Sequence, residues 1–186
     1  MQRSILQFVN QLDELLLEIP RIVRDFDQKS PQALQNLIDW IGRSEALLSS
    51  HRVSAAATIA GFKSRLIASA YTDDRRGTLR RRQLAIATGM IDELQRSVQD
   101  ALRPYAEKIR QSRDLGRQLL QIVAQSGAVK YDAGLGFEAL ITQIWALCSS
   151  HDQLKPFAIQ LKIVLPTDDI RLLLAEEIDL IDFAKG

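Results

Sequence analysis

The sequence predicts an all-α protein, an antiparallel bundle of six or seven helices around a long, bent central helix. Three observations support this prediction. Residue types that favour helices make up much of the chain, whereas only 9 Gly and 5 Pro occur among its 186 residues. Apolar residues recur at spacings of three and four in most segments. A chain of this length also buries enough surface to fold as one domain, residues 1–186, without a disulfide or a metal.

The first helix is predicted over residues 5–26. Its apolar residues form a wide stripe of the kind found in helices packed into bundles. The stripe contains Ile5, Phe8, Val9, Leu12, Leu15, Leu16, Ile19, Ile22, Val23 and Phe26. Pro20 lies inside it and removes one backbone donor. Because the stripe continues in phase beyond Pro20, we expect a kink there rather than the end of the helix.

Two further helices are predicted before residue 70. Ser30-Pro31 is a helix start signal, with Ser as the N-cap and Pro in the first helical position. The helix after it buries a stripe from Leu34 to Leu48 and has Trp40 at its flank. A third helix begins near Ser54 and is rich in small residues.

The longest helix is predicted over residues 78–125. Its apolar residues have an average spacing of about 3.6, so that a nearly straight helix keeps one face buried. They are Ile91, Leu94, Val98, Leu102, Tyr105, Ile109, Leu119 and Ile122 or Val123. Pro104 is expected to bend this helix, and Gly89 and Gly116 weaken it locally.

The segments after residue 125 are a loop and three more elements. Residues 126–136 contain three glycines and are predicted to form a loop, and a helix follows from Phe137 to Cys148. Between Pro156 and Pro166, apolar residues alternate with a period of two, which indicates a strand. A lone strand would leave its backbone groups unpaired, so we favour a helix here and keep the strand as the alternative.

The last helix is predicted over residues 167–183 and is apolar on more than one face. A terminal helix of this kind is either deeply buried or uses one side to bind a partner. If it is a docking helix, the partner-binding residues are Leu173, Ile178, Ile181 and Phe183.

Charge is unevenly distributed along the chain. Residues 75–117 carry 11 basic and 5 acidic side chains, whereas residues 132–186 carry 4 basic and 9 acidic ones. Either these segments neutralise each other in the fold, or one face attracts an anionic partner. Five arginines gather near the start of the long helix, at Arg75, Arg76, Arg80, Arg81 and Arg82. If that helix begins at Thr78, its macrodipole disfavours three of them. Arginine binds phosphate well, but no aromatic residue lies among these five, and a solvated face is the ordinary interpretation.

No catalytic or metal-binding motif is present. His51 and His151 have no metal-ligand or acid–base spacing around them, and Cys148 lies on an apolar face. Gly134-Leu135-Gly136 lacks the residues of a phosphate-binding loop. We therefore expect no metal and no cofactor.

The sequence shows neither a targeting segment nor an apolar run of membrane-spanning length, so a soluble, cytoplasmic protein without membrane contact is expected. The predicted function is that of a non-catalytic helical scaffold or adaptor that binds a protein partner or itself. The alternative is nucleic-acid or other polyanion binding by the arginine cluster at 75–82. An enzyme whose catalytic groups converge from distant positions is a third class.

Overall fold

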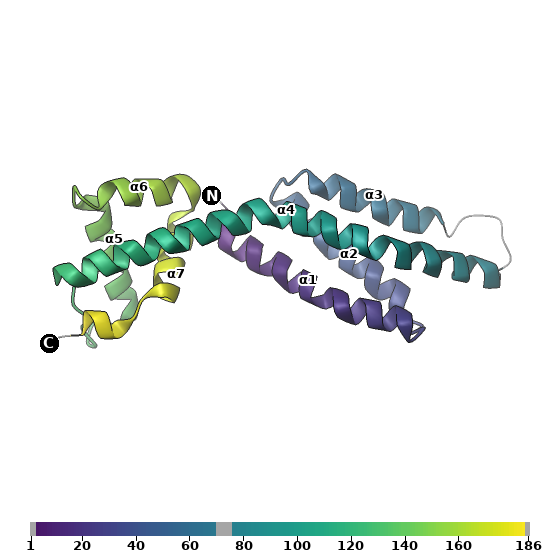
Figure 1. Ribbon diagram of the computed structural model, residues 1–186, viewed down its shortest axis with the longest axis horizontal. Helices are drawn as coiled ribbons and strands as arrows, with labels where there is room; N and C mark the ends of the chain where they lie inside the picture. The colour runs from purple at the N-terminus through teal and green to yellow at the C-terminus, as the bar shows by residue number, and fades with distance from the viewer. Residues whose placement is uncertain (1–2, 70–75, 185–186) are drawn as a thin grey trace. The chain divides into compact units, whose positions relative to one another are not determined.

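The apolar periodicity of the sequence produces helices throughout the computed structural model, which describes residues 3–69 and 76–184. In these residues there are seven α-helices and one 3₁₀ helix, and no strand (Figure 1). In chain order they are α1 (Ile5–Asp27), α2 (Ala33–Ser50), α3 (Ala55–Ala68), α4 (Arg76–Ser126), α5 (Phe137–Ser150), α6 (Lys155–Val164), α7 (Thr167–Glu177) and the 3₁₀ helix η1 (Leu180–Phe183). The predicted all-α helical bundle with a long helix is confirmed.

Except for the end of the last helix, the boundaries of the helices agree with the sequence signals to within a few residues. α1 continues through Pro20 and α4 through Pro104, so neither proline ends its helix. α2 begins at Ala33 because residues 31 and 32 form a turn before it. The segment with period two is a helix, α6, which confirms the favoured interpretation over a strand.

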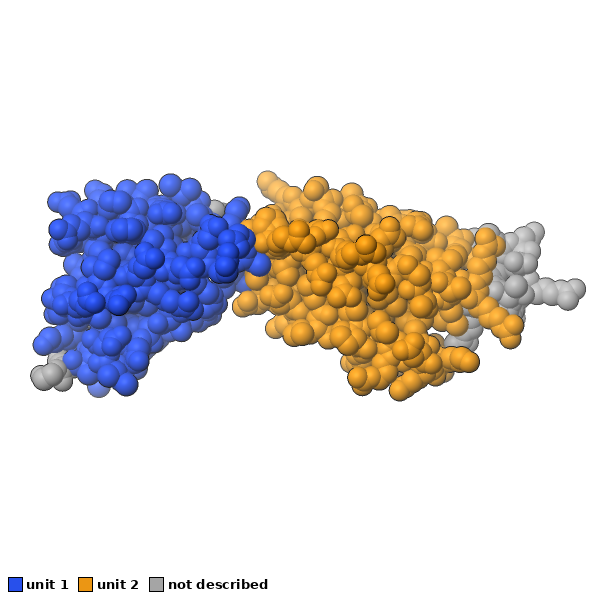
Figure 2. All heavy atoms as spheres, in the orientation of Figure 1, with its two compact units in different colours: residues 1–6, 106–186 blue, residues 7–105 orange. Residues whose placement is uncertain are grey.

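The chain divides into two compact units, which are coloured separately in Figure 2. Unit 2 comprises residues 7–105 and unit 1 comprises residues 1–6 together with 106–186. Helix α4 belongs to unit 2 up to Tyr105 and to unit 1 from Ala106. The expectation of one domain over residues 1–186 stays a prediction.

Unit 2 packs α1, α2, α3 and the first part of α4 around a core of aliphatic and aromatic side chains. Trp40, expected at the flank of its helix, is fully buried, and its Nε1 donates a hydrogen bond of 2.7 Å to the Leu15 carbonyl. The ring of His51 stacks on Phe8 with 4.2 Å between centroids, and its Nδ1 lies 3.1 Å from the Leu47 carbonyl oxygen. His51 therefore packs the end of α2 against Phe8 of α1.

Unit 1 packs α5, α6, α7 and η1 with the last part of α4. The helices come close at Gly116, where an added Cβ atom would lie only 2.7 Å from Leu173 Cδ2. Asp169 is buried, and its Oδ2 accepts hydrogen bonds from the backbone N–H groups of Ile5 (2.7 Å) and Leu6 (3.1 Å). A carboxylate of α7 thus satisfies free donors at the start of α1, as an N-cap residue would.

Candidate protein-interaction groove

Exposed apolar side chains are concentrated in unit 1. Eleven large apolar residues are exposed in the part of the chain that the structure describes, and eight of them belong to unit 1, although it is the shorter unit. The eight are Ile122, Leu135, Phe137, Ile159, Ile163, Leu172, Leu180 and Ile181. Single exposed apolar residues are ordinary, but clustered ones mark surfaces that bind other molecules. Unit 1 therefore carries most of the exposed apolar surface that a partner could cover.

A groove of ≈ 550 Å³ lies between α5 and α7. It is lined by Phe137, Glu138, Ile141, Thr142, Asp168, Arg171, Leu172 and Ala175. On α5 the lining residues are at 137, 138, 141 and 142 and on α7 at 168, 171, 172 and 175, so those of each helix lie on one side of it. Gly136, with φ of 81°, precedes α5 and allows the sharp turn that starts this helix. The lining thus extends along about one and a half turns of α5 and about two turns of α7, and its apolar floor is formed by Phe137, Ile141, Leu172 and Ala175. A groove of this form can receive a short helical segment.

The groove carries three charged side chains at its edges. They are Glu138 on α5, and Asp168 and Arg171 on α7, and all three are exposed. None of them forms an ion pair with another residue that the structure describes. Two carboxylates against one guanidinium give the rim a net negative charge. An approaching partner with basic residues is attracted to this rim and oriented by it.

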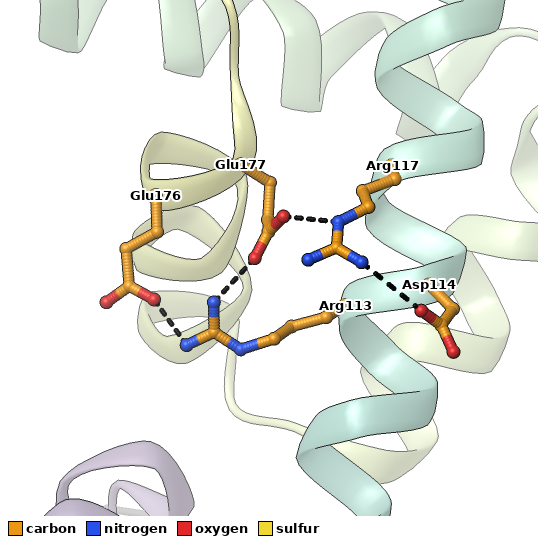
Figure 3. A network of polar contacts seen from close by, with 5 residues as sticks. All are labelled: Arg113, Asp114, Arg117, Glu176 and Glu177. Carbon is orange, nitrogen blue, oxygen red and sulfur yellow. Dashed lines mark hydrogen bonds and ion pairs between the residues drawn. The ribbon is translucent and has the colours of Figure 1, made fainter.

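An ion-pair network holds the end of α7 on α4 (Figure 3). Arg113 contacts Glu177 at 2.5 Å and Glu176 at 2.6 Å, and Arg117 contacts Glu177 at 2.5 Å and Asp114 at 3.5 Å. In this part of the fold the basic middle of the chain and its acidic end neutralise each other, which is one of the two interpretations of the charge distribution.

The network changes the pKa values of its members. Hydrogen bonding from Arg117 lowers the pKa of Glu177 below its ordinary value of 4.5; burial opposes this, and Arg113 adds a second hydrogen bond. Burial disfavours the charge on Arg113, but its hydrogen bonds to Glu177 and Glu176 outweigh burial and raise the pKa of the guanidinium. Because both groups stay charged near neutral pH, the network acts as a structural anchor for the helix that lines the groove.

The structure corrects the prediction for the last helix. α7 ends at Glu177 rather than continuing to residue 183, since Ile178 has an extended backbone. The side chain of Asp179 then accepts a hydrogen bond from the Ile181 N–H and starts η1. Because the chain changes direction here, residues 170–177 and 180–183 do not share one helix, and Ile181 and Phe183 do not extend a face of α7.

Two of the four predicted partner-binding residues are in the core. Leu173 and Phe183 are buried, so they stabilise unit 1 and present no surface to a partner. Ile178 is partly buried, and Ile181 is 80% exposed, but neither lines the groove. Sequence reasoning missed Leu172, which does line it. On a helix Leu172 points away from Ile170, Leu173 and Leu174, so a helical-wheel projection would have shown it as the outward residue.

The arginine cluster lies partly outside the described residues. Arg75 falls outside them, and Arg76 and Arg80 belong to α4 without a described side chain. Arg81 and Arg82 are exposed. Because α4 begins at Arg76 rather than at Thr78, these two lie in its second turn, where the helix dipole opposes positive charge less strongly.

Unit 2 has a cavity of ≈ 760 Å³, lined mainly by small and polar side chains. Its titratable residues are Arg52, Asp100 and Tyr105, and Asp100 is ion-paired with Arg103 at 2.7 Å on the surface. Ser97, also in the lining, donates its hydroxyl to the Glu93 carbonyl. Neither histidine lines this cavity, and we find no nucleophile–base pair among its lining residues.

Known proteins provide no further guide to function. No protein-family model, no curated protein and no solved structure matches the chain. No helix in residues 3–69 and 76–184 is sufficiently long and apolar to cross a bilayer.

Proposed function

We propose that this protein is a non-catalytic helical adaptor that binds a protein segment in the α5–α7 groove of unit 1. The observation that supports the proposal is the concentration of exposed apolar residues in this unit, two of which, Phe137 and Leu172, line a groove of helical dimensions. Covering such residues on binding contributes about 25 cal/mol per Å² of apolar surface. The rim charges Glu138, Asp168 and Arg171 then select the partner by charge.

The rigidity of the groove also suits this function. α7 is anchored at its end by Arg113 and Arg117 and near its start by Asp169, so the groove wall is held before a partner arrives. Preorganised surfaces bind more tightly because less conformational entropy is lost on association.

Site-specific photo-cross-linking tests this proposal. A benzoylphenylalanine is placed at Leu172 in the groove and, as the control, at Leu17 of α1, which is 79% exposed in unit 2. After illumination in the cell that makes the protein, mass spectrometry identifies the cross-linked peptides. We expect a defined protein peptide from position 172 at several times the yield from position 17. Equal yields from both positions would show that the groove is an ordinary surface.

The second candidate function is polyanion binding by the arginine cluster. It is supported by the exposure of Arg81 and Arg82, which form no ion pair with any residue in the described ranges. By contrast, Arg113 and Arg117 are neutralised by carboxylates.

Fluorescence anisotropy of labelled oligonucleotides at several salt concentrations tests this candidate. The double variant Arg81→Gln/Arg82→Gln is expected to bind more weakly and to reduce the slope of log K against log salt by about 2. The matched control, Arg103→Gln/Arg110→Gln, removes two arginines that are already paired along the helix. Equal affinity of the wild type and the Arg81/Arg82 variant would show that these two arginines do not contact the oligonucleotide.

A further inference from the structure

The outward face of α6 is apolar and basic. Ile159 and Ile163 are one turn apart and are 48% and 77% exposed, while Ala158 and Leu161 are buried on the opposite side. Lys155 and Lys162 are the charged residues of this helix, whose sequence KPFAIQLKIV contains no acidic residue. Lys162 Nζ lies 5.2 Å from the centre of the Trp145 ring, so a cation–π contact holds it in place. The face thus combines two exposed isoleucines with two positive charges.

This face of α6 and the α5–α7 groove are complementary. The groove has an apolar floor and a net negative rim with Glu138 and Asp168, and α6 offers isoleucines with lysines beside them. α6 has 10 residues and is about 15 Å long, and residues 168–175 of α7, which line the groove, extend over about 12 Å. Arg171 lies on the same rim and repels the lysines, but the two carboxylates outnumber it and the sum of the charges is attractive.

We infer that the occupant of the groove is α6 of a second copy of this chain. The inference rests on the proposed function of the groove and adds the identity of the partner. Groove and helix are different surfaces of the same unit, so the contact is heterologous rather than two-fold symmetric. After one pairing event, the first copy keeps its own α6 free and the second keeps its groove free. Association therefore continues to a closed ring or an open chain.

Two variants test this heterologous contact, and each disrupts one of its two surfaces, the exposed face of α6 or the α5–α7 groove. Ile163→Asp places a charge on the exposed face of α6 and leaves the groove intact, and Leu172→Asp does the reverse. Each variant alone is expected to have a dissociation constant for self-association at least ~100-fold above that of the wild type. Leu17→Asp, on α1 in unit 2, is the matched control and should assemble as the wild type does.

Mixing the two variants distinguishes a heterologous contact from a symmetric one. The intact groove of the Ile163→Asp chain binds the intact α6 of the Leu172→Asp chain, and assembly then stops because the remaining two surfaces are blocked. Sedimentation velocity should show a 1:1 dimer in the mixture, monomers of each variant alone, and larger species of the wild type. A wild type that stays monomeric at ~100 μM, or a mixture that stays monomeric, overturns the inference.

A second measurement applies even if a variant loses helical structure. A benzoylphenylalanine at position 172 of the full chain, in a mixture of ¹⁴N- and ¹⁵N-labelled protein, should give cross-linked peptides that join position 172 of one copy to residues 155–164 of another. Absence of cross-links between copies would overturn the self-association. The function of the groove is tested separately by cross-linking in the cell, where a defined peptide of a different protein at position 172 would support the groove and exclude α6 of a second copy as its occupant.

Discussion

Gly116 and Gly89 lie in the same helix, α4, but have different surroundings. At Gly89 an added Cβ atom would meet nothing within 4 Å, whereas at Gly116 it would lie 2.7 Å from Leu173 Cδ2 and 3.6 Å from Leu174 Cδ2. Carbon atoms in good contact are about 3.5–4.0 Å apart, so the first of these distances is short by roughly 1 Å. Substitution of each glycine by alanine therefore separates helix propensity from packing.

The magnitudes follow from these two effects. Replacing Gly by Ala inside a helix stabilises it by about 1 kcal/mol, and Gly89→Ala should show this gain in full. At Gly116 the same gain is opposed by overpacking against Leu173, which is fully buried, and overpacking costs about 1–3 kcal/mol. We expect the unfolding free energy of Gly116→Ala to be lower than that of Gly89→Ala by about 1–3 kcal/mol.

Urea unfolding followed by circular dichroism measures this difference, and the thiol of Cys148 reports on unit 1 separately. Cys148 is buried, and burial raises the pKa of its thiol to about 11, so it should react with a thiol reagent only after unit 1 opens. In a Leu173→Ala background, Gly116→Ala should raise the unfolding free energy, because the Cδ2 methyl group of Leu173 that would clash with the new Cβ atom is absent. Equal stabilisation by Gly116→Ala and Gly89→Ala in the wild type would refute overpacking at Gly116.

Two further predictions concern charges of unit 1. Because the pKa of Glu177 is lowered in the folded state, its contribution is present above pH 4.5 and is lost as pH falls through the folded pKa. Glu177→Gln should thus reduce the unfolding free energy by about 1–3 kcal/mol at pH 7 and have a diminishing effect in acid, as denaturant titrations from pH 7 to pH 3 would show. A loss that is constant over this range would contradict the ion-pair explanation. Asp169→Ala should lower stability by about 1–2 kcal/mol because two backbone donors lose their acceptor, whereas Asp169→Asn, which keeps a side-chain oxygen, should retain much of it in the same assay. Equal losses in the two variants would argue against the capping role.

The helices of this protein are encoded locally in the sequence. Helix periodicity, capping residues and prolines act over a few positions, so the stripe of α1, the length of α4 and the start of α3 near Ser54 could all be predicted from the sequence. For α6, the period-two pattern indicated a strand. Because no second strand was predicted to pair with it, a helix was the favoured prediction, and the structure confirms it. No comparable local signal marks Glu177 as the end of α7, because the residues after it are as apolar as those before it.

Only the tertiary structure decided which apolar residues are covered. Leu172 and Leu173 are adjacent leucines with different surroundings. The side chain of Leu173 is buried against Gly116, whereas that of Leu172 is 54% exposed and lines the groove. The difference depends on the position of Gly116 in α4, which lies more than fifty residues away along the chain. In the same way, Arg113 and Arg117 meet Glu176 and Glu177 only through folding. Periodicity determines that a helix forms, but the surface that it leaves open depends on distant segments, and the groove therefore became visible only in the folded chain.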